Sequence, residues 1–149
     1  MIEFRLRPTL SDRELNLLNS RSWPEHTDRT YDRMFARSLG HVGAFEDDRL
    51  IGFVNVATDG DRHAFLLDVA VDRDYRRRGV GRELVRISTE LATEAGCVWL
   101  HVDYEPHLDA FYRGAGFRPT SAGLIRLGRR TLSIQSVSHP ILVRGELEK

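Results

Sequence analysis

The chain has 149 residues, of which 41% are hydrophobic and 30% are charged, and its 22 basic residues balance 22 acidic ones. This length and composition fit one globular domain and exclude a chain that is disordered throughout. Balanced charge argues against nonspecific nucleic-acid binding. No apolar run approaches the ~20 residues of a membrane span and the first residues lack a signal-peptide core, so we expect a cytoplasmic protein without a membrane partner.

The residues that commonly form disulfides and metal sites are sparse. Cys97 is the only cysteine, which excludes an internal disulfide and a cysteine metal cluster. The six histidines are too scattered to form a zinc motif with two ligands one helical turn apart. We therefore expect no metal.

The first predicted elements are a strand and a helix. Residues 2–7 alternate between apolar and charged side chains, as a half-buried strand does. Ser11 and Glu14 have the spacing of a capping box, which predicts that a helix begins there. Trp23-Pro24 closes this helix.

A second helix and three strands follow. Asp28 can cap a helix whose apolar residues have helical spacing, and Gly40 is the predicted end of that helix. Residues 41–46, 50–57 and 64–71 read as strands joined by polar turns. These three strands form an antiparallel meander.

A long amphipathic helix is predicted from Gly79 to Gly96, with an apolar stripe along one face. The strand that follows it covers residues 98–102. Together with the strand over residues 64–71, this helix and strand form a right-handed crossover between parallel strands.

The order of elements describes a mixed α/β protein. Pro106 is placed to open a short helix over residues 108–115, and an extended segment covers residues 117–127. Residues 129–149 contain apolar pairs that form either edge strands, for example across a homodimer interface, or a loose tail. We therefore expect one domain over residues 1–128 and a C-terminal extension.

The stretch from residue 66 to residue 81 combines an apolar strand, a turn with glycines and a helix start. Residues 76–78 are three arginines, and they stand beside Gly79 and Gly81. A helix start offers unpaired N–H groups and the positive end of the helix dipole, and glycines let a ligand approach the backbone. Such a turn suits a phosphorylated ligand.

Two common nucleotide motifs do not fit this turn. A P-loop needs Lys followed by Ser or Thr at the helix start, where this chain has Arg82-Glu83. The dinucleotide fingerprint needs a third glycine three residues after the second, where this chain has Leu84.

Residues 76–81, Arg-Arg-Arg-Gly-Val-Gly, resemble the acyl-CoA signature of the GNAT superfamily of N-acetyltransferases. That signature is a basic residue or Gln, two variable residues, Gly, one variable residue, and Gly or Ala. The resemblance spans roughly residues 2–128. It implies a GNAT-like central mixed, mostly antiparallel sheet of six to seven strands flanked by about four helices.

The resemblance also implies which residues bind acetyl-CoA, the acyl donor. In this family the motif strand pairs with the pantetheine arm and the turn holds the pyrophosphate, which agrees with anion binding at a helix start. The matching residues are Val69, Ala70 and Val71 for the arm, and Arg77, Arg78, Gly79, Val80, Gly81 and Arg82 for the phosphates. The open alternative is a solvated charge run with a tight turn.

Residues 108–117 resemble the second recurrent segment of the family, a short helix that ends in Tyr, a few residues and Gly-Phe. Tyr112 matches the tyrosine that protonates the leaving CoA thiolate, a role that suits a phenol because it is un-ionised at neutral pH. A core residue beside Phe111 is the alternative. The Asn often found near the start of this helix has no counterpart in residues 105–107, so that CoA contact is not transferred.

Asp68 is the candidate base, since it adjoins the residues that would bind the pantetheine arm. A carboxylate among apolar neighbours is poorly solvated, and this favours its uptake of a proton. A carboxylate that only bonds neighbouring backbone is the alternative. His101 and Asp103 alternate on one face of the next strand, and Glu105 lies at the end of that strand. Each of the three either relays protons, contacts the substrate or has a structural role.

The predicted substrate-binding residues are Trp23, His26 and His101. Trp23 and His26 fall between the first two predicted helices, where the family forms its acceptor wall. Trp23 is equally suited to anchor the end of the first helix.

The sequence thus predicts an acyl-CoA-dependent N-acyltransferase that moves acetyl from acetyl-CoA to a primary amine directly, without a covalent enzyme intermediate. Tyr112 acts as general acid in this hypothesis. Two alternatives stay open, a CoA-binding regulatory domain without catalysis and a nucleotide-binding module that uses the arginine-rich turn.

Overall fold

The computed structural model describes residues 1–128, which divide into one unit over Met1–Pro119 and a second that begins at Thr120. All the helices and strands of the described residues belong to the first unit. The edge strands considered for residues 129–149 lie outside the described residues.

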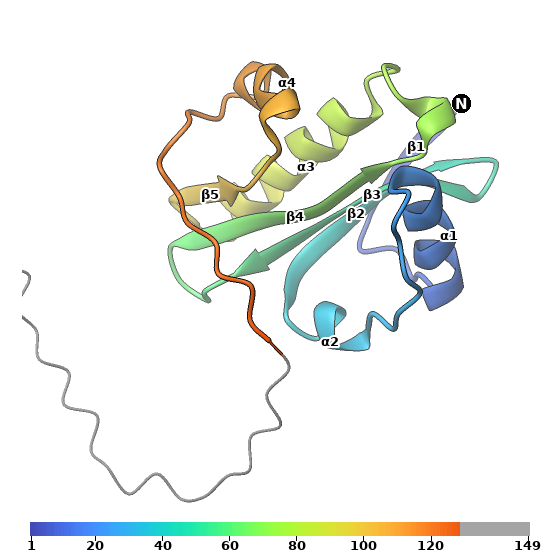
Figure 1. Ribbon diagram of the computed structural model, residues 1–149, viewed down its shortest axis with the longest axis horizontal. Coiled ribbons are helices and arrows are strands. Elements are labelled where there is room, and N and C mark those ends of the chain that lie inside the picture. The colour runs from blue at the N-terminus through green and yellow to red at the C-terminus, as the bar shows by residue number, and fades with distance from the viewer. Residues whose placement is uncertain (129–149) are drawn as a thin grey trace, which may run out of the picture. The chain divides into compact units, whose positions relative to one another are not determined.

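One five-stranded sheet forms the centre of the first unit (Figure 1). The strands lie in chain order, with antiparallel pairing from β1 to β4 and parallel pairing between β4 and β5. The predicted meander and parallel crossover are therefore confirmed. The strands are β1 Ile2–Leu6, β2 Ser38–Glu46, β3 Arg49–Thr58, β4 His63–Val71 and β5 Trp99–Val102.

Helices cover both faces of the sheet, with α1 and α2 on one face and α3 and α4 on the other (Figure 1). The predicted capping box opens α1, since Ser11 Oγ accepts from the Glu14 N–H and the Ser11 N–H donates to the Glu14 carboxylate. Among residues 1–128, no helix has the length and apolar character of a membrane span. The helices are α1 Asp12–Ser22, α2 Asp32–Phe35, α3 Val80–Glu94 and α4 Asp109–Gly114, with 3-10 turns η1 Arg73–Tyr75 and η2 Pro106–Leu108.

Apolar burial holds these helices to the sheet. Leu84 of α3 packs into the core on one face with Val54 of β3, and Leu15 of α1 packs into the core on the other face with Phe53. All four side chains are at most 1% exposed. Full burial of such a side chain contributes about 1.5–3 kcal/mol to the stability of the fold. A few apolar residues on each helix are therefore enough to determine which side of the helix packs on the sheet.

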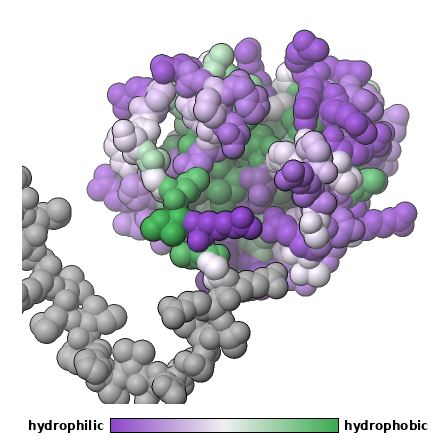
Figure 2. Space-filling view, in the orientation of Figure 1, coloured by the Kyte–Doolittle hydropathy of each residue, from purple (hydrophilic) through white to green (hydrophobic). Residues whose placement is uncertain are grey.

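The two helical layers leave part of the sheet open. Seen from the side used in Figure 1, polar residues cover the outer helical surfaces, whereas apolar residues gather in a hollow over β4, between α4 and α1 (Figure 2). The uncovered part of β4 therefore offers an apolar surface.

The second predicted helix is wrong in its extent. α2 has only four residues, its N-cap is Tyr31 instead of Asp28, and Gly40 lies in β2 instead of ending a helix. A Cβ atom on Gly40 would lie 2.6 Å from Leu91 Cδ2 of α3. The glycine thus allows close packing of α3 on β2. In the sequence, a glycine kept for such packing looks the same as a glycine that ends a helix.

The described residues do not match the predicted sheet of six to seven strands, because residues 1–128 contain five. Residues 117–127, expected to be extended, form no strand in the described part of the chain. Leu124, Ile125 and Leu127 are 83%, 86% and 86% exposed. A strand needs a paired neighbour and a surface to bury against, and apolar residues in the sequence alone supply neither.

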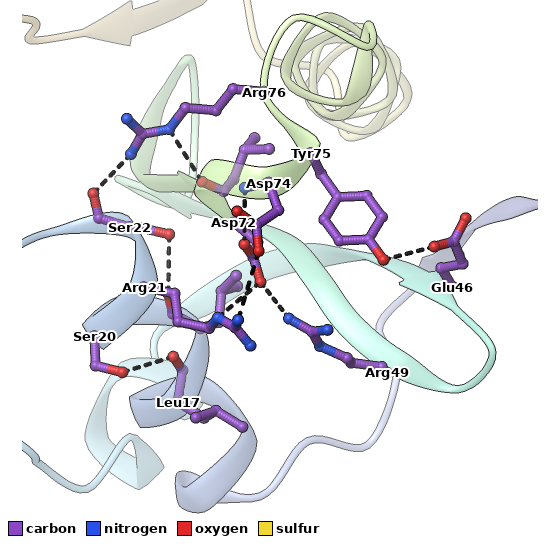
Figure 3. A network of polar contacts seen from close by, with 12 residues as sticks. Leu17, Ser20, Arg21, Ser22, Glu46, Arg49, Asp72, Asp74, Tyr75 and Arg76 are labelled. Atoms are coloured by element: carbon purple, nitrogen blue, oxygen red, sulfur yellow. Dashed lines mark hydrogen bonds and ion pairs between the residues drawn. The ribbon is translucent and has the colours of Figure 1, made fainter.

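A buried carboxylate joins three elements beside the uncovered part of β4 (Figure 3). Asp72, directly after β4, is 0% exposed and accepts from Arg49 Nη2 of β3 at 2.5 Å and from the Asp74 N–H at 3.1 Å. Arg21 Nε of α1 lies 3.2 Å from the same carboxylate as an ion pair without hydrogen-bond alignment. Asp72 therefore fixes α1 and β3 to the start of the turn that follows β4.

Replacing Asp72 with Asn should lower the free energy of unfolding by about 1–3 kcal/mol, because two arginines lose a buried counter-charge. The loss stays below that of a wholly buried pair because the Arg21 and Arg49 side chains are 33% and 43% exposed. Urea unfolding followed by circular dichroism measures the change.

Asp74→Asn is the matched control. The Asp74 side chain is 62% exposed and lies 3.6 Å from Arg21, so its loss should change the unfolding free energy by less than about 0.5 kcal/mol. Equal losses in the two variants would contradict an anchoring role for Asp72.

Candidate active site

β4 changes its partners halfway along its length. Its pairs with β5 end at Leu66 with Val102, so Leu67–Val71 lies beyond the paired stretch on that side. Toward β3, Asn55 pairs with Leu67 and Phe53 with Ala70, which leaves two β4 residues opposite the single residue between Phe53 and Asn55. This is a β-bulge, and it adjoins an unpaired backbone edge.

The bulge also changes the faces to which the β4 side chains point. Leu66 before the bulge packs into the α3 core, whereas Ala70 after it packs into the α1 core and is 2% exposed. Val69 and Val71 instead contact the α3 core. Of the three predicted arm-binding residues, Ala70 therefore offers only its backbone, while Val69 and Val71 also present side chains on the α3 side.

The turn after β4 ends in a helix start without a side-chain cap. Arg77 and Gly79 have left-handed backbone, with φ of 59° and 81°. α3 begins at Val80, no side chain caps it, and its first backbone hydrogen bond runs from the Glu83 N–H to the Gly79 carbonyl at 3.1 Å. Within residues 1–128 the N–H groups of residues 79–82 have no described backbone acceptor, so they are available at the positive end of the helix dipole.

The arginines of the turn differ in their contacts. Arg76 Nη2 donates to the Ser22 carbonyl at the end of α1 at 2.8 Å, and its Nε donates to the Val71 carbonyl at 3.5 Å (Figure 3). Arg78 stands over the Tyr75 ring, 4.9 Å from its centroid. Arg76 therefore holds the turn in place, whereas the predicted phosphate ligands Arg77, Arg78 and Arg82 are exposed to solvent.

The second segment packs against this turn. A Cβ atom on Gly81 would lie 3.3 Å from the Phe111 ring of α4, so the glycine allows α4 to approach the start of α3. Tyr112 follows Phe111 and is 4% exposed. It stacks on Tyr104 with centroids 4.7 Å apart, and burial raises the pKa of its phenol. The candidate acid thus stays un-ionised at neutral pH beside the candidate phosphate turn.

One residue of α1 organises the loop that contains two predicted substrate ligands. Asn16 donates from Nδ2 to the Arg29 carbonyl at 2.9 Å, and its Oδ1 accepts from the Arg29 N–H at 3.1 Å and the Tyr31 hydroxyl at 3.1 Å. His26 Nε2 lies 3.0 Å from the same oxygen. His26 therefore belongs to the internal bonding of the loop, while Trp23 caps α1 and is 41% exposed.

Asp68 lies at the bulge with left-handed backbone, φ 54°. Its side chain is 39% exposed, so the desolvated setting expected from its apolar neighbours is not present. Its carboxylate lies 3.7 Å from Arg29 Nη2 of the loop after α1. The structure thus brings the candidate base to the loop that carries Trp23 and His26.

His101 belongs to a different group. Its Nε2 lies 2.7 Å from His63 Nδ1, and its ring stacks on Phe65 with centroids 4.9 Å apart. These three residues come from β4 and β5 and have no described contact with Trp23 or His26.

Sequence reasoning missed Asn16, Arg29 and Asp72. Asn16 stands among leucines in a predicted helix, where a side chain that competes for backbone hydrogen bonds is unusual, so it carried a signal. Arg29 carried none, because its importance comes from a contact with Asp68 on a distant strand.

Known proteins share this sequence pattern and fold. Residues 10–117 match the acetyltransferase (GNAT) family. A mycothiol acetyltransferase of Mycolicibacterium vanbaalenii is 33% identical over 66 residues, which cover 44% of this chain and 22% of that protein. The chain therefore spans well under two thirds of that relative's length.

Solved structures agree with the arrangement of elements. A GNAT family acetyltransferase from Streptococcus pneumoniae superimposes with a TM-score of 0.74 at 21% identity, covering 87% of this chain and 100% of that chain. An aminoglycoside N-acetyltransferase, AAC(6')-Iy in complex with CoA, has a TM-score of 0.66 at 21% identity, with 87% and 96% covered. With the matching fold and both signature segments in place, the chain belongs to the GNAT acetyltransferase family.

Proposed function

We propose that the protein transfers an acetyl group from acetyl-CoA to a primary amine. The observation that carries this proposal is the uncapped start of α3, with left-handed residues in the turn before it, beside the unpaired edge of β4. The turn supplies N–H donors for a pyrophosphate, and the edge supplies backbone groups for the amide-bearing pantetheine arm. The structural neighbour solved in complex with CoA supports the same ligand.

The transfer is direct in this proposal. The neutral amine attacks the thioester carbonyl, a C–N bond forms, and the C–S bond breaks as the sulfur leaves with its electron pair. Tyr112 donates its hydroxyl proton to that sulfur and is reprotonated from solvent. Burial favours the neutral phenol, which is the form that can donate.

The ammonium form of the acceptor must lose one proton before it can attack as a neutral amine, and the nitrogen loses a second proton to solvent once the C–N bond has formed. In this proposal Asp68 accepts the first of these protons, because its carboxylate lies at the bulge, where the unpaired edge of β4 begins. Trp23, on the loop that reaches Asp68 through Arg29, forms part of the acceptor wall, with His26 holding the loop. His101 contacts a part of the acceptor that extends along β4 and β5.

Two measurements test the proposal. Calorimetry with CoA, acetyl-CoA and NAD should show binding of the first two in preference to the dinucleotide, and a thiol-release assay over a panel of amines should show turnover. Binding of CoA without turnover on any amine would favour a regulatory CoA-binding domain. Preference for the dinucleotide would overturn the assignment.

The double variant Arg77→Glu and Arg78→Glu should weaken CoA binding by about 10-fold to 100-fold, because two exposed positive charges beside the phosphates become negative. Calorimetry at low and high salt measures the effect, which should shrink as salt rises. Arg33→Glu, on α2, makes the same kind of charge change on an exposed side chain and should leave CoA affinity within about twofold. Parallel losses in both variants would indicate a net-charge effect only.

Tyr112→Phe should lower kcat by about 100-fold with little change in acetyl-CoA affinity, as expected when an acid catalyst is lost from an otherwise intact site. Because burial raises the pKa of Tyr112, the wild-type rate should not fall through loss of this acid until the pH exceeds about 10. Single-turnover rates between pH 6 and 10.5 check both points.

Tyr104→Phe is the matched control, since it removes a hydroxyl from the ring stacked on Tyr112. That hydroxyl donates to Asp109 at 2.9 Å, away from any proposed proton transfer. A similar rate loss in both variants would assign the effect to packing of the two rings instead of to acid catalysis.

A further inference from the structure

Arg29 is a cation that the fold positions without using its hydrogen-bond donors. Its guanidinium carbon stands 4.5 Å from the centroid of the Tyr31 ring, and its Nη2 lies 3.7 Å from Asp68 Oδ2. That separation exceeds the usual hydrogen-bond range of about 2.7–3.2 Å. Within residues 1–128 the guanidinium donates no hydrogen bond, and the side chain is 51% exposed.

The support beneath Arg29 is well ordered by its contacts. Asn16 bonds both the N–H and the carbonyl of Arg29, at 3.1 and 2.9 Å. Tyr31 is 1% exposed, its N–H donates to Asp12 at 2.9 Å, and its hydroxyl accepts from Asn19 Nδ2 at 2.7 Å. A guanidinium stacked on such a ring loses little conformational entropy when it binds a ligand.

Several arginines of the described unit use their guanidinium donors, unlike Arg29, whereas Arg78 also stands over an aromatic ring but belongs to the proposed phosphate turn. Arg5, Arg86 and Arg113 each donate to a carboxylate of a neighbouring side chain. Arg49 donates to Asp72 and Arg76 to backbone carbonyls. Arg29 combines a fixed position with unused donors, at the edge of the candidate active site.

From this arrangement we infer that the acceptor is an amine that also carries an anionic group, a carboxylate or a phosphate, which binds Arg29 while its amine lies at Asp68. This inference rests on the proposed acetyl transfer. A guanidinium fork matches both anions, and the neighbouring carboxylate attracts the ammonium that precedes the reactive amine. An acceptor with positive charges alone would place one of them beside Arg29.

The pair formed by Arg29 and Asp68 also favours release of the product. Acetylation converts the amine to a neutral amide and leaves the anionic group in place. Once Asp68 has released to solvent the proton that it took from the amine, the carboxylate no longer attracts this nitrogen and repels the remaining anion, so the product binds more weakly than the acceptor.

Matched pairs of amines test the inference. Phenylalanine against phenylalaninamide varies a carboxylate, and glucosamine 6-phosphate against glucosamine varies a phosphate. We expect kcat/KM to be at least about 10-fold higher for the anionic member of one pair, and the pair that shows it identifies the anion. The ammonium group of phenylalaninamide loses its proton more easily than that of phenylalanine. A preference for phenylalanine would therefore not arise from a larger fraction of neutral amine.

Arg29→Gln should reduce the ratio of kcat/KM between the anionic and neutral members at least about 10-fold. Calorimetry of the anionic amine in the presence of CoA should show a matching loss of affinity without any chemistry. Arg33→Gln, on α2, is the control and should leave the ratio as in the wild type. Thermal unfolding and CoA affinity establish that the Arg29 variant is folded.

The outcomes separate this inference from the proposed function. If the wild type acetylates neutral and anionic amines equally, or if Arg29→Gln leaves their ratio unchanged, the acceptor assignment is wrong and acetyl transfer stands. If CoA does not bind and no amine is acetylated, acetyl transfer itself is wrong, and the acceptor assignment fails with it.

Discussion

The candidate site depends on one extra residue in β4. The residue of β3 between Phe53 and Asn55 faces two residues of β4, and this bulge reverses the side-chain faces beyond it. Ala70 can then pack under α1 while Val69 and Val71 face α3, and the pairing with β5 has already ended at Leu66. The sheet stays continuous on the β3 side and has an unpaired edge on the other, which is what an extended amide-bearing ligand requires.

Two distant segments of the chain act as one packed unit around this edge. Gly81 at the start of α3 lacks the Cβ atom that would crowd Phe111, and the adjoining Tyr112 is buried in the same core. On the other side, Asp72 and Arg76 bind the turn to α1, whose end leads into the loop that carries Trp23, His26 and Arg29. The proposed donor and acceptor regions are thus joined by an ion pair on the buried Asp72 carboxylate and by a part-buried hydrogen bond from Arg76.

Much of this arrangement could be predicted from the sequence, since strands, long helices and the capping box follow from local patterns. The errors came from tertiary demands. Gly40 is required by the contact with Leu91, although a glycine after a short apolar stretch suggests a helix end. The hydrogen bonds between the Asn16 side chain and the Arg29 backbone join residues 13 positions apart across a loop, and no periodic pattern predicts such a contact.

In the mechanism that we propose, backbone groups at the start of α3 and along the edge of β4 bind acetyl-CoA. A titration of 15N-labelled protein with CoA, followed by the amide signals in NMR, tests it most directly. We expect the largest shifts in Gly79–Arg82 and Val69–Val71, with saturation at one equivalent of CoA. Binding that leaves these amides unshifted, with the largest changes elsewhere in the chain, would contradict it.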